Sequence, residues 1–586
     1  MTSGGRWSRA AIAAFIAALL YLPGLGRPAL WEPDEGRYAE IAREMVVSGD
    51  YVTPRDNLVR YFEKPPLVYW AEAVSLHVFG ANEFAVRLPA ALFTIAEVGV
   101  TCVVGEGMFG PVAGFMAAII LALCPLVFVL ARFATLDPAL AFFLTAAMGA
   151  FHFASSAGFE GRAGRAWMLI ASGLLALGTL AKGPVALLLA GAIALVWIKV
   201  EHRGRDIRRM PIVSCIATYL AIAAPWFVIA AMRNPGFLSF FFVHEHLQRF
   251  VSSQEHGWGP WFFVPIVLAG TWPWIFFVRG GLSAWREVDE SQRAEVRSAL
   301  RLLVIWFGVI FIFFSIPRSK LGGYILPALP PIAMVSGVAL SRLGAMSTGR
   351  PARLLGLFAL TNIAVEAVAI VVLFLIREKL GFWLELEGIM IASVVSTGSI
   401  VAWLLSLETP RSGAIFAALA VSMILVSWIG ERARINAGAD TTYRVLASQI
   451  RGYDGCVFAS YRHFEQSLPF YTGQREVLVE YRGELAPFAQ TPDERAGFIG
   501  TEARLQQLWA SDRCLVMIAN RKDLKDLLKI LRPTPRIVGC EGKKVALYNR
   551  DGAPAPSGCD SIDTNSAAAS LWSSQLAALG FKADGR

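Results

Sequence analysis

The amino-acid sequence predicts a mainly α-helical, polytopic membrane protein with a small C-terminal α/β domain. Of its 586 residues, 55% are hydrophobic and only 17% are charged, whereas a soluble domain averages roughly 45–50% apolar and about 25% charged residues. The mean hydropathy is +0.51. Apolar runs recur over the first 430 residues, and a polar segment follows them. This composition excludes disorder, coiled coil and collagen, and it disfavours an ordinary cytosolic enzyme.

About thirteen transmembrane helices are expected, because a run of roughly 17–25 apolar residues is long enough to cross a bilayer. The expected spans are 10–29, 84–104, 111–131, 138–157, 166–181, 184–199, 211–232, 261–279, 301–316, 324–341, 354–376, 388–407 and 412–429. The first span follows Arg6 and Arg9 and has no convincing cleavage site after it, so we interpret it as an uncleaved helix whose N-terminus lies inside.

Basic residues predict the orientation of these helices. They cluster in one set of loops, on the side of Arg6 and Arg9, at 162–165, 199–209, 286–297 and 342–353. Because Lys and Arg concentrate in cytoplasmic loops, this side is the cytoplasm. The outer loops are then 30–83, 132–137, 233–260 and 317–323, together with the tail after residue 430. We therefore expect a multi-pass inner-membrane protein whose outer face is periplasmic. The net charge of +9 comes with no basic–aromatic module, so no nucleic-acid partner is expected.

Three parts are expected along the chain. A transmembrane domain covers 1–430, with loop helices at about 30–83, and a periplasmic α/β domain covers 431–550, where short apolar segments alternate with helical patterns. The tail at 551–586 is rich in Ala, Ser, Gly and Pro and should be poorly ordered. Four cysteines would suit disulfides if this region is exported, although the sequence does not fix their pairing. They are Cys456, Cys514, Cys540 and Cys559.

The first outer loop opens a helix with acidic residues, in the sequence WEPDEGRYAE at 31–40. Pro33 suits a first turn, and acidic residues there complement the helix dipole. Asp34, Arg37 and Tyr38 then share one helix face. The pattern allows an interfacial helix with an Asp34–Arg37 ion pair. It also allows a site that holds a carboxylate, a guanidinium and a phenol at the membrane surface.

Two further clusters have both a structural and a functional interpretation. Glu63 and Lys64 precede two prolines that stiffen the chain. They could belong to an aromatic belt with snorkelling charges, or form a fixed acid–base pair that binds a phosphate or a metal. Asp137 precedes Pro138, and an N-cap for the next span explains it sufficiently.

The remaining outer loops carry cations. In VHEHLQRF at 243–250, Glu245 and Arg249 are spaced i,i+4, which is typical of a surface ion pair, and the two histidines do not share a helix face. The segment 317–324 places a glycine pair and polar groups at the mouth of a span, which suits a phosphate or diphosphate lipid head. These groups are Arg318, Lys320 and Tyr324. Together the outer loops concentrate ionisable residues on the face that should be poor in cations, which indicates a site for an anionic ligand.

These motifs resemble the membrane glycosyltransferases of the GT-C fold and, within them, the lipid A aminoarabinose (4-amino-4-deoxy-L-arabinose) transferases, which are related to the protein O-mannosyltransferases. The motifs lie within residues 31–330 and are WEPDEGRYAEIAREM, YFEKPPLVYW, FGANEFAVR, ATLDP, AKGP, FFVHEHLQRF and SKLGGYILPALPP. The resemblance implies a polyprenyl-phosphate sugar donor, a lipid A or other glycolipid acceptor, contact with membrane lipids and transfer on the periplasmic face by one inverting displacement. A monomer is expected.

The resemblance also implies roles for individual residues. Asp34 matches the essential acid of the first loop, and Asp137 matches the second-loop acid, so both are expected to be catalytic. The residues that match groups around the donor phosphate are Arg37, Tyr38, Tyr61, Lys64, Arg249 and Tyr324, and Lys182 matches a basic residue near the cavity. Glu63 and His244 match positions where a divalent metal, zinc or magnesium, could bind. The spacing alone does not demand a metal.

Several alternatives stay open at this point. An ionised lipid A phosphate needs no strong base, so Asp34 would orient it or stabilise an oxocarbenium-like sugar. A hydroxyl acceptor would make Asp34 the general base. A paralogous enzyme could move mannose or galacturonic acid to a glycolipid or protein. A lipid flippase or exporter predicts charges along the inner spans, whereas the charges here crowd one face.

Overall fold

A computed structural model gives the fold of the chain and divides it into two compact units. It describes all residues except 1–2, 249–257, 284–285, 287–288, 344–349, 381, 408–410, 438–442, 482, 486–487, 551–558 and 560–586. Unit 1 contains Met1–Arg27, Phe62–Val78 and Phe84–Ala437, and unit 2 contains Pro28–Tyr61, Phe79–Glu83 and Gly438–Arg586. The linear division expected from the sequence assigned the loop at 28–61 to the membrane domain, whereas the structure groups it with the C-terminal residues.

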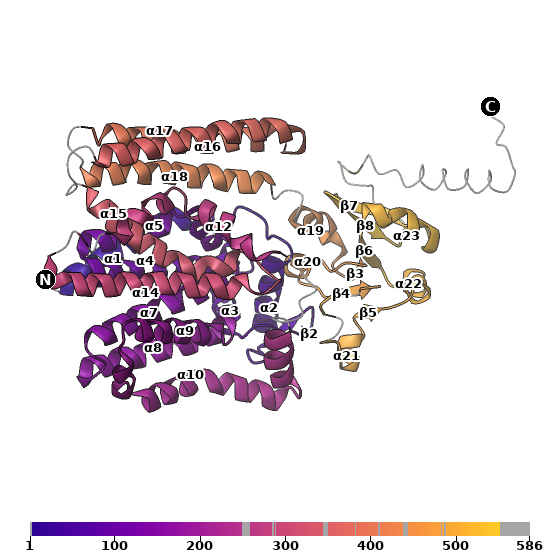
Figure 1. Cartoon of the computed structure of the whole chain (residues 1–586). Coiled ribbons are helices and arrows are strands. Elements are labelled where there is room, and N and C mark those ends of the chain that lie inside the picture. The colour runs from indigo at the N-terminus through magenta and orange to yellow at the C-terminus, as the bar shows by residue number, and fades with distance from the viewer. Residues whose placement is uncertain are drawn as a thin grey trace. The chain divides into compact units, whose positions relative to one another are not determined.

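Unit 1 is helical (Figure 1). Its helices are α1 (Ser3–Tyr21), α3 (Leu67–Phe79), α4 (Glu83–Phe109), α5 (Pro111–Leu123), α6 (Pro125–Ala131), α7 (Asp137–Ser156), α8 (Gly161–Lys182), α9 (Val185–Val200), η1 (Gly204–Arg209), α10 (Ile212–Arg233), η2 (Ser239–Gln248), η3 (Pro260–Phe262), α12 (Phe263–Gly270), η4 (Trp274–Phe277), α13 (Val278–Leu282), α14 (Glu290–Ser315), η6 (Gly322–Ala328), α15 (Leu329–Ser341), α16 (Arg350–Leu380), α17 (Phe382–Leu404) and α18 (Ser412–Ala437).

The multi-pass prediction is confirmed, but the count of thirteen spans is not. Within the described ranges, nine helices are long and apolar enough to cross a membrane, and two bent pairs raise the number to at most 11. Each of the thirteen expected segments overlaps a helix or a bent pair. The pair α5–α6 bends by 64° just before Pro125, and the pair from η3 to α13 bends by 95° near Pro273. The helix α9 has only 16 residues, and α1 is not among the nine.

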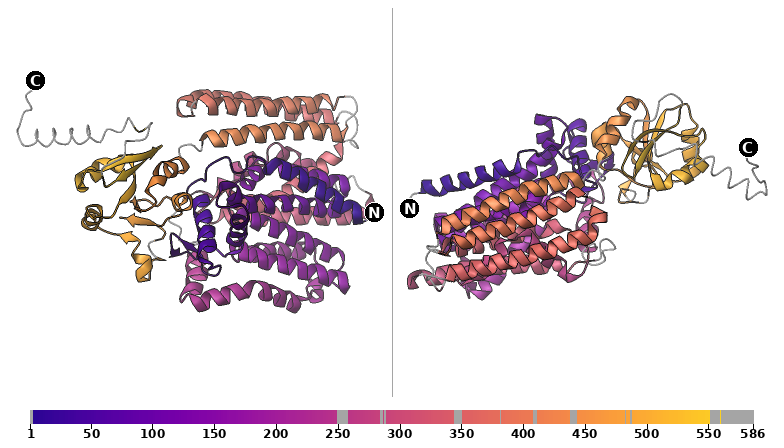
Figure 2. Two further views of the ribbon diagram at one scale, coloured as in Figure 1. Left: turned by 180° about the vertical axis from the view of Figure 1, so that it is seen from behind. Right: turned by 90° about the horizontal axis from the view of Figure 1, so that it is seen from above.

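Small residues allow the helices of unit 1 to pack closely. A Cβ on Gly114 would lie 2.2 Å from the backbone nitrogen of Glu106, and one on Gly337 would lie 2.8 Å from the backbone oxygen of Ala113. Close backbone approach of this kind is how helices associate in membranes, where burial of apolar surface between helices gives no advantage over lipid. The helices α16, α17 and α18 also lie side by side, as Figures 1 and 2 show.

Unit 2 contains an α/β domain, as the sequence predicted. Its sheet has the strand order β5-β4-β3-β6-β8-β7, in which β3, β4, β5 and β6 are parallel and β7 and β8 are antiparallel to their neighbours. The strands are β3 (Val457–Tyr461), β4 (Glu476–Val479), β5 (Phe498–Ile499), β6 (Leu515–Asn520), β7 (Arg536–Glu541) and β8 (Lys544–Tyr548). The helices are α19 (Arg444–Ile450), η9 (Arg451–Tyr453), α20 (Ser467–Thr472), α21 (Pro492–Arg495), α22 (Glu502–Trp509), η11 (Arg521–Asp523) and α23 (Leu524–Ile530).

Both faces of this sheet are covered. Along β6, Leu515 and Met517 belong to the core cluster that contains Trp509 and Leu527, and Val516 belongs to the cluster that contains α19. Successive side chains of a strand point to opposite faces, so a strand that is apolar throughout is buried on both sides.

The loop at 28–61 belongs to unit 2 because its residues bond to the C-terminal domain. It forms α2 (Asp34–Ser48) and a hairpin of β1 (Arg55–Asp56) and β2 (Val59–Arg60). A Cβ on Gly36 would lie 2.4 Å from the backbone nitrogen of Ser467, so only glycine permits this contact. The side chain of Asn57 bonds to both the carbonyl oxygen and the amide of Glu476, at 2.9 and 2.8 Å. Gly49 ends α2 with a left-handed φ of 71°.

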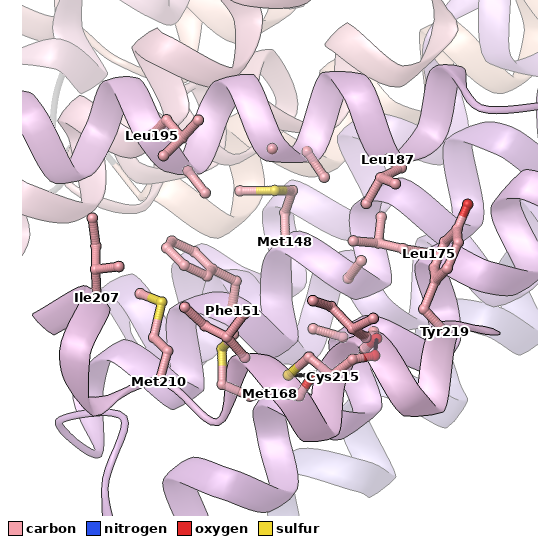
Figure 3. A pocket seen from close by; sticks show the side chains of 18 of the residues that line it. Met148, Phe151, Met168, Leu175, Leu187, Leu195, Ile207, Met210, Cys215 and Tyr219 are labelled. Atoms are coloured by element: carbon pink, nitrogen blue, oxygen red, sulfur yellow. Dashed lines mark hydrogen bonds between the residues drawn. The ribbon is translucent and has the colours of Figure 1, made fainter. Parts of the chain in front are cut away.

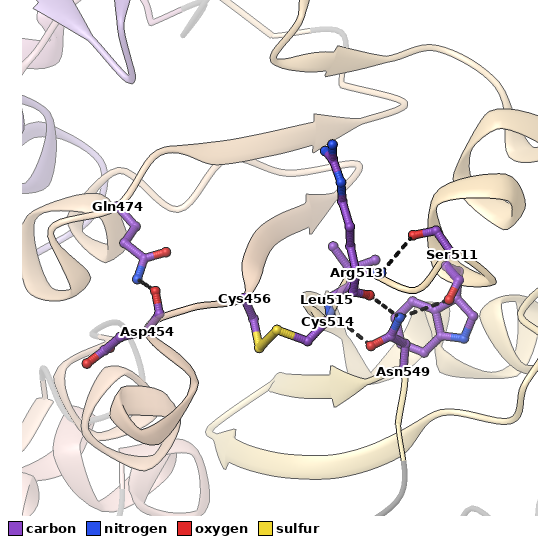
Figure 4. The surroundings of a disulfide bond; sticks show 9 residues. Asp454, Cys456, Gln474, Ser511, Arg513, Cys514, Leu515 and Asn549 are labelled. Atoms are coloured by element: carbon purple, nitrogen blue, oxygen red, sulfur yellow. Dashed lines mark hydrogen bonds between the residues drawn. A yellow bond between two sulfur atoms is a disulfide. The ribbon is translucent and has the colours of Figure 1, made fainter.

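Two disulfides stabilise unit 2, and they settle which of the three pairings of four cysteines forms. Cys456 pairs with Cys514, and Cys540 pairs with Cys559. The first bond joins the residues that precede the neighbouring strands β3 and β6 (Figure 4). Beside it, the side chain of Asn549 accepts a hydrogen bond from the amide of Leu515 at 2.9 Å.

Candidate active site

Arg37 is the centre of the candidate group in unit 2. It lies on α2, one turn after Asp34, and its Nη1 donates to Asp34 Oδ1 at 3.2 Å. The predicted i,i+3 ion pair is therefore present. Arg37 Nη2 lies 2.5 Å from Oε1 of Glu484, in the segment that follows β4. The guanidinium also lies 5.8 Å from the ring centroid of Tyr61. Two carboxylates and an aromatic ring thus surround one cation.

The two tyrosines expected near this group are buried. Tyr38 is on α2, and Tyr61 follows β2 and packs against Phe488 with 6.2 Å between ring centroids. Burial of the Tyr61 ring fixes the aromatic face that the guanidinium contacts, and such a contact contributes roughly 0.5–2 kcal/mol. The structure therefore brings together Asp34, Arg37 and Tyr61.

Asp56 is a buried acid that the sequence did not single out. Its side chain is fully buried, and neither carboxylate oxygen has a hydrogen-bond partner in the part of the chain that the structure describes. Burial raises the pKa of Asp56 well above its usual range, and the positive charge of Arg37 opposes this shift. Asp56 is the last residue of β1, directly before the turn residues Asn57 and Leu58, which both have positive φ. No local signal marked Glu484 either, because its partner is far away in the chain.

Lys64 forms the first candidate group in unit 1. Its Nζ donates to Glu245 Oε1 at 2.5 Å and lies 3.9 Å from Glu63 Oε2. The expected partner of Glu245 was Arg249, which lies outside the described residues, as does the side chain of His244. Lys64 Nζ also donates to the carbonyl oxygen of Glu63 at 3.2 Å. An anionic ligand of this ammonium would therefore have to share it with these oxygens.

Asp137 and Lys182 form the second candidate group. Lys182, in the last turn of α8, makes an ion pair with Asp137, and its Nζ lies 4.4 Å from the ring centroid of Tyr324. A Cβ on Gly323 would lie 2.8 Å from Asp137 Oδ2, so the glycine pair lets η6 approach the carboxylate. The prediction that Asp137 caps α7 is wrong: Leu136 is the N-cap, and Asp137 is the first helical residue. Its carboxylate binds Lys182 because an uncompensated cation there would be costly to bury.

The two cations of the fifth outer loop are not part of this group. Lys320 is buried, and its Nζ donates to the carbonyl oxygens of Trp258, at 3.1 Å, and of Pro317. Arg318 is exposed, and its carbonyl oxygen accepts from the amide of Trp258 at 3.2 Å. The geometry therefore makes Lys320 a residue that shapes the loop. The phosphate-binding role expected of Lys320 stays a prediction.

The described residues do not form a metal centre. They contain no group of three or more His, Cys, Asp or Glu side chains that could hold a metal ion. Of the two residues expected to bind the metal, Glu63 lies beside the ammonium of Lys64, which also contacts Glu245. A divalent metal at Glu63 and His244 stays a prediction from the sequence.

An apolar cavity of about 490 Å³ lies among α7, α8, α9 and α10 (Figure 3). Met148, Phe151 and Met168 line it, and no charged side chain does. Without a cation it suits an apolar chain and not a phosphate.

Comparison with known proteins identifies the family. The family of dolichyl-phosphate-mannose-protein mannosyltransferases matches residues 7–241, and the aminoarabinose transferase C-terminal domain matches residues 446–549. An undecaprenyl phosphate-α-4-amino-4-deoxy-L-arabinose arabinosyl transferase of Pseudomonas fluorescens is 32% identical over 437 residues, which are 72% of this chain and 73% of that protein. The chain belongs to the aminoarabinose transferase family. An enzyme of the same description from Erwinia tasmaniensis is 33% identical over 62% of this chain and 64% of its own length.

A solved structure supports the same assignment. The crystal structure of ArnT from Cupriavidus metallidurans, bound to undecaprenyl phosphate, is 27% identical with a TM-score of 0.83 and covers 93% of this chain and 99% of its own. The resemblance inferred from the motifs is confirmed, and so are the GT-C fold and the class of enzyme. This member of the aminoarabinose transferase family is a multi-pass membrane glycosyltransferase. The roles of individual residues are proposals.

Proposed function

We propose that the protein transfers 4-amino-4-deoxy-L-arabinose from undecaprenyl phosphate to a phosphate of lipid A or to a related glycolipid, as a monomer on the periplasmic face of the inner membrane. The observation that carries this is the meeting of Asp137, Lys182 and Tyr324, which come from three outer segments of unit 1. A cation, a carboxylate and a phenol at the ends of spans suit a lipid-linked sugar phosphate. The activity of the relatives supplies the sugar and the donor.

The chemistry is a single displacement. The bond between the anomeric carbon and the donor phosphate breaks, the leaving phosphate keeps the electron pair, and an acceptor oxygen bonds to the opposite face of the carbon. The configuration is therefore inverted. Negative charge grows on the leaving phosphate, and fixed cations such as Lys64 and Lys182 would stabilise it.

Asp34 acts on the sugar or the acceptor. An acceptor phosphate is already ionised at neutral pH, so the carboxylate orients it or stabilises positive charge on the ring. Arg37 forms an ion pair with Asp34, and the ring of Tyr61 lies against the guanidinium.

A metal is a separate proposal from the sequence. If Glu63 and His244 hold zinc or magnesium, elemental analysis of the purified protein should find the ion. Glu63→Gln should then lower the metal content. A metal-free protein with full activity would exclude this role.

The experiment that tests the function is mass spectrometry of lipid A from cells with and without the gene. The proposal expects an added aminoarabinose that disappears on deletion. Loss of a hexose or a uronic acid instead would identify the paralogous activity. An unchanged lipid A, combined with no transfer by purified protein from undecaprenyl-phosphate-linked aminoarabinose, would refute the proposal.

A further inference from the structure

Arg37 needs more than one partner, because its side chain is only 10% exposed. Taking a charge out of water is costly unless other charges compensate it. Asp34, on the same helix, contacts Nη1 at 3.2 Å, and Glu484 contacts Nη2 at 2.5 Å. The contact with Glu484 is the shorter of the two, and charge-assisted bonds of this length are the strong ones.

Glu484 is itself held in place by a neighbouring loop. Its Oε1 also accepts a hydrogen bond from Gln466 Nε2 at 3.1 Å. Gln466 follows β3 and Glu484 follows β4, and these two strands are parallel neighbours. Both side chains therefore come from the carboxyl ends of adjacent parallel strands, which is the edge where α/β sheets commonly bind ligands. In unit 2 a side chain at this edge, Glu484, binds Arg37 of α2.

We propose that Glu484 is a positioning residue through which the C-terminal domain acts on the reaction. Asp34 lies only one turn before Arg37, so a guanidinium without a second partner would fold onto Asp34 with both terminal nitrogens. Glu484 draws Nη2 away and leaves the Asp34 carboxylate with a single contact from Arg37. This inference rests on the proposed function, which gives Asp34 and Arg37 their roles.

A double-mutant cycle on the full-length protein tests it. The four proteins are wild type, Glu484→Ala, Arg37→Met and the double variant, assayed for transfer from undecaprenyl-phosphate-linked aminoarabinose. Glu484→Ala should lower kcat/KM about tenfold or more, mainly through kcat, because it removes a hydrogen bond to a charged group. In the Arg37→Met background, Glu484→Ala should lower kcat/KM by less than twofold. Glu484→Gln keeps an acceptor oxygen and should recover part of the loss.

The matched control is Glu480→Ala, in the same domain. Glu480 pairs with Arg462 at 2.9 Å, whereas Glu484 pairs with Arg37, so the loss of Glu480 should leave kcat/KM unchanged. If Arg37→Met has no measurable turnover, the affinity for undecaprenyl phosphate replaces kcat/KM in the cycle.

Three results would be decisive. Full activity of Glu484→Ala, or an equal loss in both backgrounds, overturns the role of Glu484. If Arg37→Met loses activity and Glu484→Ala does not, this inference is refuted and the proposed function is unaffected. Full activity of Arg37→Met refutes the roles that the proposed function gives to Asp34 and Arg37.

Discussion

Lys64 and Glu245 are 181 positions apart in the chain, yet the ammonium nitrogen of one lies 2.5 Å from a carboxylate oxygen of the other. Lys182 and Asp137 form a similar pair over 45 positions. In each pair the carboxylate lowers the cost of burying the cation. A phosphate that binds to Lys64 must share the ammonium with Glu245.

Lys64→Ala is expected to lower the rate of transfer. Loss of a charge-assisted contact is worth roughly 1.5–3 kcal/mol, or about a 10- to 150-fold effect. The loss should fall mostly on kcat, because the donor phosphate gains charge only as it leaves. Steady-state kinetics with purified polyprenyl-phosphate sugar measure it. The control is Lys199→Ala, an exposed lysine of a basic loop. A change confined to KM would contradict transition-state stabilisation, and an unchanged rate would remove Lys64 from the phosphate site.

Asp34→Asn should abolish transfer while expression and membrane insertion stay normal. The amide keeps the size of the side chain and removes the charge that faces Arg37. The matched control is Asp50→Asn, in the same loop. Asp50 Oδ1 accepts from the amides of Val52 and Thr53, and the Asn variant keeps that oxygen. Radiolabelled transfer compares the two, and near-normal turnover by a well-expressed Asp34→Asn protein would exclude the catalytic role.

The first outer loop and the tail are expected on the same side of the membrane, outside the cytoplasm. Basic residues concentrate in the alternate loops, which predicts this orientation. Alkaline phosphatase fused at residue 50 and at residue 500 should therefore be active in both cases. A fusion in the basic loop at 199–209 serves as the cytoplasmic control. An inactive fusion at either outer position would contradict the predicted topology and, with it, the lipid-donor proposal.

The four cysteines of unit 2 should be oxidised in the native protein, as expected for an exported domain. Cys102, Cys124 and Cys215 are free thiols, whereas the other four form two bonds. The denatured, unreduced protein should therefore bind three equivalents of a maleimide, and the reduced protein should bind seven. Cys456→Ser should destabilise the domain by about 2–4 kcal/mol. Seven reactive thiols before reduction would place this domain in a reducing compartment.

The stability of unit 2 should fall as pH rises from about 5 to 8. Burial and the neighbouring Glu40 raise the pKa of Glu44 from 4.5 to about 8. Between pH 5 and 8 the folded state keeps the proton on Glu44, whereas the unfolded state releases it. The free energy of unfolding therefore falls as pH rises through this range.

Glu44→Gln should abolish this part of the pH dependence, because the amide cannot ionise. It keeps the oxygen that accepts from the amide of Leu58. The unfolding temperature should rise by about 2–4 °C relative to wild type at pH 8 and stay unchanged at pH 5. The exposed Glu502→Gln is the control. An equal shift at both pH values would show that ionisation of Glu44 is not the cause.

Local patterns in the sequence determined much of this protein. Apolar length located the long helices and bent pairs of unit 1, and the acidic first turn located the start of α2. The spacing of Asp34 and Arg37 gave their ion pair, because residues three or four apart are neighbours on any helix. Such rules depend only on the geometry of one element.

The tertiary structure decided what each charged group contacts. Arg37 binds Glu484, Lys64 binds Glu245, and Asp137 binds Lys182 where the sequence suggested a helix cap. The grouping of 28–61 with the C-terminal domain and the bends that reduce the number of straight spans were also beyond the sequence. These contacts join segments far apart in the chain, and their free energy exists only once the chain has folded, so no local spacing records them.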